Sequence, residues 1–426
     1  EGYVATPGWI RAFNVKTGKL AWTFHTIPQP GEYGYDTWPP DAYKYIGGVN
    51  TWGEMTLDEK RGIVYLPVGS PTYDYYGADR LGSNLFSDCL VALDARTGKR
   101  LWHFQFVHHD LWDYDPTAAP QLLTLTQNGK KVEAVAQATK QGFVYVFDRV
   151  TGKPLLGIDE RPVPQEPRQA TAATQPYPRG DAIVPQEIDI VPEGANLLPG
   201  TGDIKNHGRI FTPYFTDEVM VKPATMGGAT WPPSSYDPTT HTLYVCATDR
   251  ISTFKALADP GKPGPNKVYM GGSFGQAEAN DRGILAALDV TTNKLVWRQS
   301  WREICYSGSI VTAGGLLFVG RSDGRLTALD KSTGKKLWEF MTDAGVNTTA
   351  TTFEHKGKQY VVVHAGGGVF ANGKRGDGIW MFSLDGKIPS LTQGATEGRR
   401  GFGGPGGAPA AAALPVTTRP PNAAHG

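Results

Sequence analysis

VALDARTGKRLW, residues 91–102, is a twelve-residue phrase that recurs along the chain. The other four copies are RAFNVKTGKLAW, YVFDRVTGKPLL, AALDVTTNKLVW and TALDKSTGKKLW, at residues 11–22, 145–156, 286–297 and 327–338. Each copy has an alternating strand, an Asp or Asn that begins a turn, a Gly or Asn suited to a positive φ, and a second strand that usually ends in Trp. The phrase therefore predicts a β-hairpin that is repeated along the fold.

Further strand candidates lie between the hairpins, at residues 62–67, 142–147, 242–247, 315–320 and 359–365. With them, each repeat supplies about four short strands, which is the content of one blade of a β-propeller. Trp297 and Trp338 end the last two copies and are 41 positions apart, as expected for a blade of about 40 to 45 residues. We interpret the recurrent Trp as structural, docking one blade on the next. The sequence thus indicates an all-β propeller with about five to six blades in this chain, the first without its opening strands.

Two insertions and a tail interrupt the repeat. Residues 160–216 and 256–282 are rich in Pro and polar residues, and loops of this length usually form functional lids or substrate walls, with oligomer contacts as the alternative. Near the end of the chain the sequence is low in complexity, with GFGGPGGA at residues 401–408, and it predicts a flexible tail. We therefore assign residues 1–390 to the propeller and residues 391–426 to the tail.

Composition excludes several classes of function. The chain has 426 residues and a formal net charge of +1, and without a basic stripe we expect no nucleic-acid partner. No run of 18 apolar residues is present, so no segment is predicted to span a membrane. Cys89, Cys246 and Cys305 form no CxxC pair, and we interpret all three as buried small hydrophobic residues rather than a disulfide framework.

The segment WHFQFVHHDLWDYD, residues 102–115, is chemically the richest of the chain. It joins two adjacent histidines, three carboxylates and several aromatic rings. Each acid could merely cap a turn between blades. His108 and His109 could bind a metal with Asp110, but neighbouring residues on a strand point to opposite faces, which disfavours a shared ion. Positioning near a cofactor and simple packing remain as the alternatives for the two histidines.

Three features together resemble the quinoprotein dehydrogenases, most closely their glucose dehydrogenase branch. They are the TGK hairpins that end in Trp, VHHDLWDYD at residues 107–115, and ATKQGFVYVFDR at residues 138–149. The resemblance extends over roughly residues 10–370 and implies an eight-bladed propeller that holds pyrroloquinoline quinone (PQQ) and calcium. Because a propeller must close to remove its sheet edges, we expect the other blades to come from residues before Glu1 or from another chain, as in a homo-oligomer.

The resemblance implies roles for particular residues at the cofactor. Asp113 is implied as the general base, which takes the hydroxyl proton as hydride leaves the substrate carbon. Lys140 is implied as the cation at the quinone oxygens, and Trp52 as the floor beneath the flat ring system. Thr230 and Trp231 match a second pocket segment, where relatives often carry Asn in place of Thr230; a threonine can still donate one hydrogen bond.

Calcium ligands are implied at Ser70, where many relatives have Asn, and at Asp113. The family's Glu ligand would lie upstream of Glu1, and calcium takes six to eight oxygens, so this chain offers only part of a calcium site.

The function that the resemblance implies is PQQ-dependent oxidation of a sugar or alcohol hydroxyl, glucose-like or polyol. The enzyme would work in the periplasm, attached to the inner membrane through an N-terminal segment, and would pass electrons to ubiquinone or cytochrome c. A non-enzymatic propeller scaffold for protein–protein contacts is the alternative. A scaffold explains the repeats but gives no role to VHHDLWDYD or to the segment around Lys140.

Overall fold

The computed structural model describes residues 3–127, 129–188, 206–264, 267–276, 282–368, 370–371 and 373–391. Within these ranges the regular structure is almost entirely strand. Helix is limited to three single 3-10 turns, η1 (Tyr35–Thr37), η2 (Ala42–Lys44) and η3 (Pro167–Gln169). None of the described helices is long and apolar enough to cross a membrane. The all-β prediction is confirmed.

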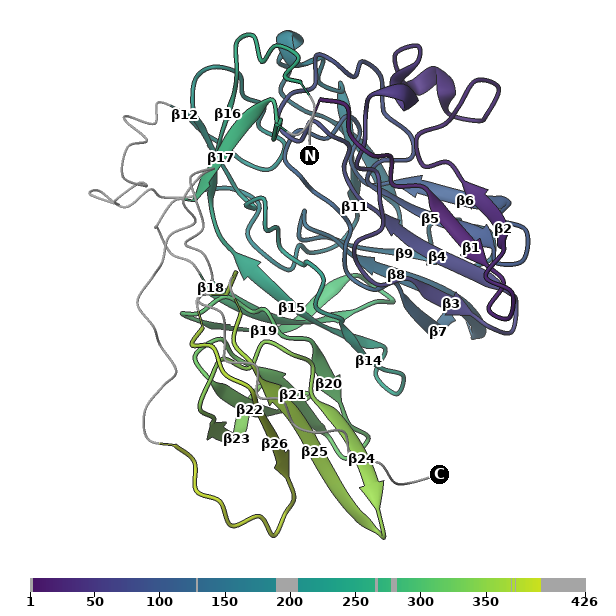
Figure 1. Ribbon diagram of the computed structural model, residues 1–426. Coiled ribbons are helices and arrows are strands. Elements are labelled where there is room, and N and C mark those ends of the chain that lie inside the picture. The colour runs from purple at the N-terminus through teal and green to yellow at the C-terminus, as the bar shows by residue number, and fades with distance from the viewer. Residues whose placement is uncertain are drawn as a thin grey trace, which may run out of the picture.

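Small antiparallel sheets follow one another along the chain, and Figure 1 shows them in a curved series from β1–β6 (purple to blue) to β20–β26 (green to yellow). Their strands, in sheet order, are β1 (Ile10–Phe13) and β2 (Leu20–Phe24); β3 (Thr56–Asp58), β4 (Ile63–Val68), β5 (Cys89–Asp94) and β6 (Arg100–Gln105); β7 (Gln121–Gln127), β8 (Lys130–Ala138) and β9 (Val144–Asp148); β14 (Ser235–Asp237), β15 (Thr242–Asp249), β18 (Arg282–Asp289) and β19 (Lys294–Trp301); β20 (Ser309–Val311), β21 (Leu316–Gly320), β22 (Arg325–Asp330) and β23 (Lys336–Met341); and β24 (Thr351–His355), β25 (Lys358–Ala365) and β26 (Gly378–Phe382). This is the arrangement of propeller blades; the number of blades in the chain stays a prediction.

The repeated hairpins form as the phrase predicts. In the turn after β5, the Asp94 Oδ1 atom accepts hydrogen bonds from the backbone N–H groups of Arg96 and Thr97 at 3.0 and 2.9 Å. Gly98 closes this turn with a φ of 71°. In the copy at residues 286–297 the equivalent residue is Asn293, which has a φ of 57°; Asn tolerates the left-handed region. A few neighbouring residues thus specify each turn.

The recurrent tryptophan docks one sheet on the next, as predicted. Trp102 is only 7% exposed, and its Nε1–H donates to the carbonyl oxygen of Arg149, in the turn of the following copy, at 3.2 Å. Trp22 and Trp297 make the same bond to the turns of the copies that follow them, at 3.1 and 3.0 Å. A Cβ atom on Gly152 would lie 2.5 Å from the Trp102 ring, so the turn glycine also makes room for the indole.

The two insertions contain more regular structure than the sequence predicted. The first forms a hairpin of β10 (Ile158–Pro162) and β11 (Thr174–Pro178), and the second contributes β17 (Gly272–Gln276) to a sheet with β12 (Asn206–His207), β13 (Val219–Val221) and β16 (Ser252–Ala256). The sequence did not predict the first hairpin because its prolines argue against strands. Pro is nevertheless tolerated on edge strands, where its missing N–H leaves no ladder hydrogen bond unmade. Residues 189–205, 277–281 and 392–426, which include nearly all of the assigned tail, lie outside the described residues.

The cysteines also differ from the expectation. Cys246 and Cys305 form a disulfide with a Cα–Cα distance of 5.5 Å, whereas Cys89 is free and buried as predicted. The two partners are 59 positions apart, and they meet because the connection after β19 passes back over Gly283 of β18, the strand beside β15. Sequence spacing alone does not reveal such a contact.

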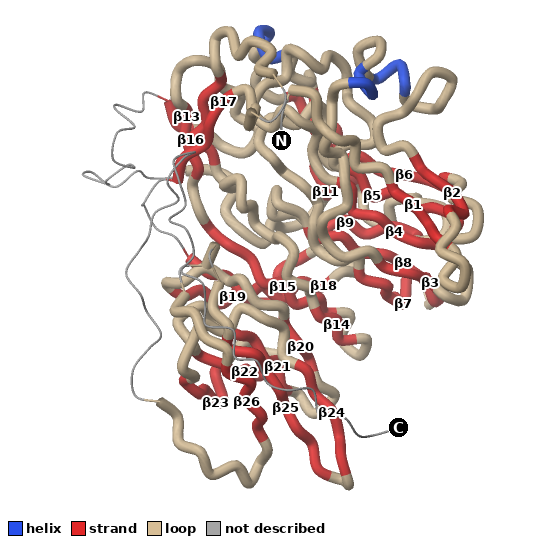
Figure 2. The backbone as a smooth tube through the Cα atoms, viewed as in Figure 1, coloured by secondary structure: helices blue, strands red, loops and turns tan. Residues whose placement is uncertain are grey.

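Each blade-like sheet has two distinct ends. The hairpin turns occupy one end, whereas the connections that follow β4, β6, β8 and β19 leave from the opposite end, because neighbouring strands are antiparallel. Long loops and 3-10 turns gather above β4–β9 in Figure 2. Side chains from these different connections can therefore meet at the loop-bearing end.

Candidate functional site

An acid–lysine cluster lies at the loop-bearing end of the sheets. Lys140, whose side chain is 4% exposed, donates from Nζ to the carbonyl oxygen of Asp113 at 2.6 Å and to Asp113 Oδ2 at 3.0 Å. The same ammonium donates to Asp115 Oδ2 at 2.8 Å. The Ser70 backbone N–H donates to Asp115 Oδ1 at 2.5 Å, and its Oγ lies 3.2 Å from Asp113 Oδ1. Three separate connections, after β4, β6 and β8, thus meet at one charged cluster.

Local backbone geometry aims the two acids of this cluster. Asp113 has a φ of 59°, and the loop around it is set by Asp110, whose carboxylate accepts the N–H groups of Trp112 at 3.0 Å and Tyr114 at 2.8 Å. Asp110 is therefore a turn residue, one of the two readings left open by the sequence. On the other side, a Cβ atom on Gly69 would lie 2.4 Å from Asp115 Oδ1, so a glycine is required for the close approach.

The two carboxyl groups differ in their affinity for a proton. Burial, together with repulsion from Asp115, raises the pKa of Asp113 well above its usual range although Lys140 opposes the shift. Burial also disfavours ionisation of Asp115, but Lys140 and several hydrogen bonds outweigh it and lower the pKa of Asp115. Burial of Lys140 is likewise outweighed by the two acids, and its pKa is raised. The cluster therefore holds Asp115 and Lys140 as ions and makes Asp113 the group that takes up a proton.

Trp52 lies beside the cluster with its indole 49% exposed. The Lys140 Nζ atom is 5.7 Å from the centroid of that ring. A core tryptophan would be covered on both faces, so this ring is free to stack on a flat ligand.

The GGATW segment, residues 227–231, packs directly on the Lys140 backbone. The Gly228 N–H donates to the Lys140 carbonyl oxygen at 2.6 Å, and a Cβ atom on Gly227 would lie 2.3 Å from Lys140 Cβ. Thr230, which is 7% exposed, has a buried Oγ1 whose hydrogen-bonding neighbour is the Tyr306 side chain. Trp231 meets the ring of Tyr306 edge to face at 5.3 Å. The segment thus brings a buried hydroxyl to the site.

Tyr306 is a site residue that sequence reasoning missed. It lies in the connection after β19, outside every motif, and only the fold brings it to Trp231. Burial raises the pKa of Tyr306, whereas hydrogen bonding to Trp231 and the charge of Lys140 oppose that shift. The charge effect places Tyr306 within electrostatic reach of the acid–lysine cluster.

The two adjacent histidines do not join the cluster. His109 is buried, with Nδ1 and Nε2 each 2.8 Å from a carbonyl oxygen, and burial lowers its pKa to about 4. His108 contacts Gln105 and Glu160 at 2.8 and 3.1 Å and lines a surface cavity of about 520 Å3. None of the acid–lysine residues lines that cavity. Packing therefore accounts for both histidines better than contact with a cofactor.

A series of propeller blades whose loops gather a buried acid–lysine cluster beside an exposed indole defines a ligand-binding β-propeller. The family model described as "PQQ: Glucose/ethanol/alcohol dehydrogenase, beta-propeller domain" matches residues 2–281 and 289–361. The chain belongs to this family, and both the propeller fold and the predicted resemblance are confirmed.

Individual relatives agree with the family assignment. The chain is 30% identical to the quinoprotein glucose dehydrogenase of Escherichia coli (strain K12), over 89% of this chain and 54% of the relative. It is also 30% identical to the glycerol dehydrogenase large subunit of Gluconobacter oxydans (strain 621H), over 89% of this chain and 60% of the relative. The solved quinohemoprotein alcohol dehydrogenase ADHIIG from Pseudomonas putida HK5 superposes with a TM-score of 0.74 at 27% identity, covering 93% of this chain and 59% of that one. The chain thus spans little more than half the length of these relatives.

The side chains at the site fit PQQ, the cofactor named by the family. Trp52 offers an exposed aromatic face, Lys140 a buried positive charge beside it, and Thr230 a buried hydroxyl next to the Tyr306 side chain. These are the features that a flat, negatively charged quinone requires of its pocket. Trp231 follows Thr230 in the chain and packs against Tyr306 at the same end of the sheets.

The fit to calcium is weaker. Ser70 and Asp113 do lie together, 3.2 Å apart, but Lys140 already binds both carboxylates of the cluster. The described residues contain no group of three or more His, Cys, Asp or Glu side chains that could hold a metal ion. Because calcium takes six to eight oxygens, these residues do not complete a calcium site by themselves.

Proposed function

We propose that this protein oxidises a sugar or alcohol hydroxyl, glucose-like or polyol, with PQQ as the hydride acceptor and Asp113 as the general base. The observation that carries the proposal is the buried Lys140 ammonium between Asp113 and Asp115, beside the exposed ring of Trp52. Relatives named for glucose, glycerol and alcohols support this substrate class. The scaffold alternative gives this buried charge cluster no role.

Asp113 has the properties of a proton acceptor. Its side chain is 28% exposed, so a substrate hydroxyl can reach it, whereas Asp115 is only 6% exposed. Its raised pKa makes the ionised carboxylate a stronger base than an ordinary Asp. When bound, PQQ supplies the chemistry of hydride acceptance. Asp113 takes the hydroxyl proton of the substrate in the same reaction.

The neighbours of Asp113 hold it in position for this role. Lys140 binds both its backbone oxygen and its Oδ2, which fixes the orientation of the carboxylate and stabilises its ionised form. When Asp113 becomes protonated, Asp115 stays ionised and still balances the charge of Lys140. Ser70 hydrogen-bonds both acids and keeps them together. The cluster therefore gains one proton without leaving an unbalanced buried charge.

The wider setting of the reaction follows from the family. We place the protein in the periplasm, attached to the inner membrane through a further N-terminal segment, with ubiquinone or cytochrome c as electron acceptor. A further N-terminal portion or a second copy completes the propeller, because a closed ring of blades leaves no exposed sheet edges. Residues 1–390 act as the propeller.

Replacing the base tests this proposal. The chain is supplied with PQQ and calcium, and dye reduction is followed with glucose, glycerol and simple alcohols. Asp113→Asn should lower turnover by about 10²- to 10⁴-fold, the usual contribution of a general base, while PQQ still binds. Asp385→Asn, an exposed acid paired with Lys358, is the control and should leave turnover unchanged.

Two results would contradict the proposal in different ways. Full turnover in Asp113→Asn would show that another group is the base. No absorbance change when PQQ is added to the unaltered chain would favour the scaffold instead.

A further inference from the structure

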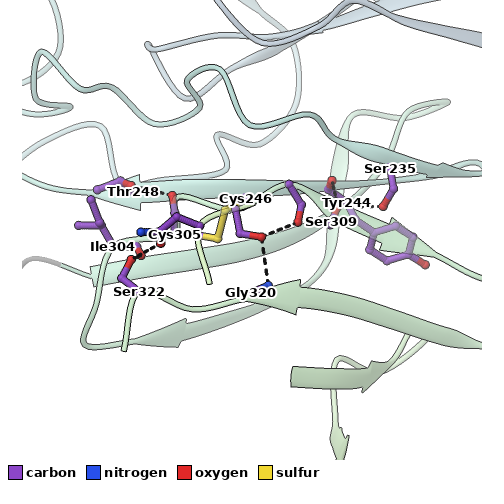
Figure 3. Close-up of a disulfide and its surroundings, with 12 residues drawn as sticks. Ser235, Tyr244, Cys246, Thr248, Ile304, Cys305, Ser309, Gly320 and Ser322 are labelled. Carbon is purple, nitrogen blue, oxygen red and sulfur yellow. Dashed lines mark hydrogen bonds between the residues drawn. A yellow bond between two sulfur atoms is a disulfide. The ribbon is translucent and has the colours of Figure 1, made fainter. Parts of the chain in front are cut away.

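The Cys246–Cys305 disulfide fastens a loop at the loop-bearing end to the middle of a sheet. Cys246 lies in β15 and Cys305 in the connection between β19 and β20 (Figure 3). Cys246 and Cys305 are 2% and 3% exposed, so the disulfide is buried. Backbone pairing of β15 with β18, and of β18 with β19, already holds the sheet together. The bond therefore chiefly constrains the connection at residues 302–308.

Hydrogen bonds and one ion pair share this task. Within the connection, Glu303 pairs with Arg321 at 2.6 Å. The Cys305 carbonyl oxygen accepts from Thr248 Oγ1 at 3.4 Å, and the Ile304 carbonyl oxygen accepts from Ser322 Oγ at 3.2 Å (Figure 3). Ser307 Oγ donates to the Thr348 carbonyl oxygen at 2.9 Å. Neutral bonds of this kind each contribute about 0.5 to 1.5 kcal/mol and a partly exposed ion pair about 1 kcal/mol, whereas a disulfide contributes about 2 to 4 kcal/mol, so the covalent link is the strongest single restraint on the connection.

The disulfide holds Tyr306 in position. This residue follows Cys305 directly and precedes Ser307, so both of its neighbours are held. Its ring meets Trp231 at 5.3 Å with an interplanar angle of 80°, the edge-to-face geometry that aromatic pairs prefer. Trp231 in turn follows Thr230, whose buried hydroxyl also interacts with the Tyr306 side chain. A covalent path thus runs from β15 to the wall of the candidate site.

We propose that the Cys246–Cys305 disulfide positions Tyr306 against Trp231, so that cleaving this bond loosens the wall of the site and weakens PQQ binding. This inference rests on the function proposed above. A dithiol reductant cleaves the S–S bond, leaves two cysteine thiols and is itself converted to a disulfide. Tyr306 acts here as a positioning residue, through Trp231, and takes no part in the chemical step.

Four variants of the 426-residue chain separate this role from general stability. They are the Cys246→Ala/Cys305→Ala pair, Tyr306→Ala, Tyr306→Phe, and the cysteine pair combined with Tyr306→Ala. PQQ binding is measured by equilibrium dialysis, which does not depend on turnover, and thermal unfolding is recorded for each variant. Cys89→Ala removes a buried cysteine outside the disulfide and serves as the matched control.

The cysteine pair and Tyr306→Ala should each weaken PQQ binding by about tenfold, the size expected for one aromatic edge contact. Their combination should be no weaker than either alone, because both changes remove the same contact. Tyr306→Phe keeps the ring but loses the hydroxyl that contacts Trp231 and Thr230, so it should weaken PQQ binding less than Tyr306→Ala does. Cys89→Ala should bind as the unaltered chain does.

Three results would overturn the inference. Unaltered PQQ binding in the cysteine pair would show that the disulfide serves only the stability of the fold. Losses that add in the combined variant would show that the disulfide and Tyr306 act independently. If the unaltered chain binds no PQQ, the proposed function fails and the inference fails with it, whereas failure of the cysteine pair alone leaves the proposed function intact.

Discussion

Replacing Lys140 with Met should destabilise the protein in a way that depends on pH. The substitution keeps most of the aliphatic volume but removes an ammonium that makes three hydrogen bonds at 2.6 to 3.0 Å. Asp113 and Asp115 then lose their common cation. Asp115 is the more affected because its side chain is only 6% exposed, whereas Asp113 is 28% exposed and partly solvated.

The size of the loss follows from the burial of the pair. Removing one partner of a buried ion pair costs about 3 to 5 kcal/mol, since the remaining charge is left uncompensated. Without Lys140, the pKa of Asp115 should rise above its unfolded value, so the folded variant binds more protons than the unfolded chain. Stability then falls as pH rises, by about 1.4 kcal/mol per pH unit for each extra proton. The loss relative to the unaltered protein should therefore be largest at pH 7.5 and clearly smaller at pH 5.

Urea unfolding followed by tryptophan fluorescence at pH 5, 6 and 7.5 measures this dependence. Lys336→Met is the matched control: its ammonium is 59% exposed and pairs with Glu339 at 3.2 Å, so its loss should stay below about 1 kcal/mol at every pH. Adding Asp115→Asn to Lys140→Met removes the stranded charge and should restore part of the stability and flatten the pH dependence.

A loss that is equal at all three pH values would refute this reasoning. Lys140 would then contribute by packing of its stem and not by its charge. The same conclusion would follow if Asp115→Asn failed to restore any stability to the Lys140→Met variant.

Two further predictions concern the turn glycines and the pH dependence of turnover. Gly152→Ala should cost more than about 2 kcal/mol, because its φ is 72° and the new Cβ would lie 2.5 Å from Trp102, whereas Gly62→Ala, with a φ of 66° and open space around it, should cost only about 1 to 2 kcal/mol. Thermal unfolding compares the two, and equal losses would argue against the indole contact. The kcat/KM for the alcohol substrate should rise with pH through the raised pKa of Asp113 and then level off, because only the ionised carboxylate accepts a proton. A pH profile that falls over the same range would exclude this carboxylate as the base.

The site also shows why single residues are hard to interpret from sequence. Asp110, Asp113 and Asp115 are alike in the sequence, yet the first sets a turn, the second has a raised pKa and the third a lowered pKa. Their differences come from neighbours in other loops, above all Lys140. The resemblance to a family indicated Asp113, but only the fold identifies Asp115 as the partner that keeps the charge balanced.

The repeat of the hairpin phrase was by itself sufficient to determine the kind of sheet and the role of its tryptophan. Each turn depends on hydrogen bonds between residues two and three positions apart, such as Asp94 with Arg96 and Thr97, so a short stretch of sequence specifies it. The docking of Trp102 on the next turn follows from the regular repeat.

Tertiary structure alone decided which loops meet. Lys140 reaches acids 25 and 27 positions away, and Cys246 pairs with a cysteine 59 positions away. Tyr306, in the connection after β19, contacts Trp231, in the connection before β14. Such contacts depend on how separate sheets pack and on which end their connections leave, and no local hydrogen-bond pattern encodes either. Residues 91–102 and their copies therefore predicted the propeller. The chemical site is defined only in the tertiary structure, where the loops between those copies come together.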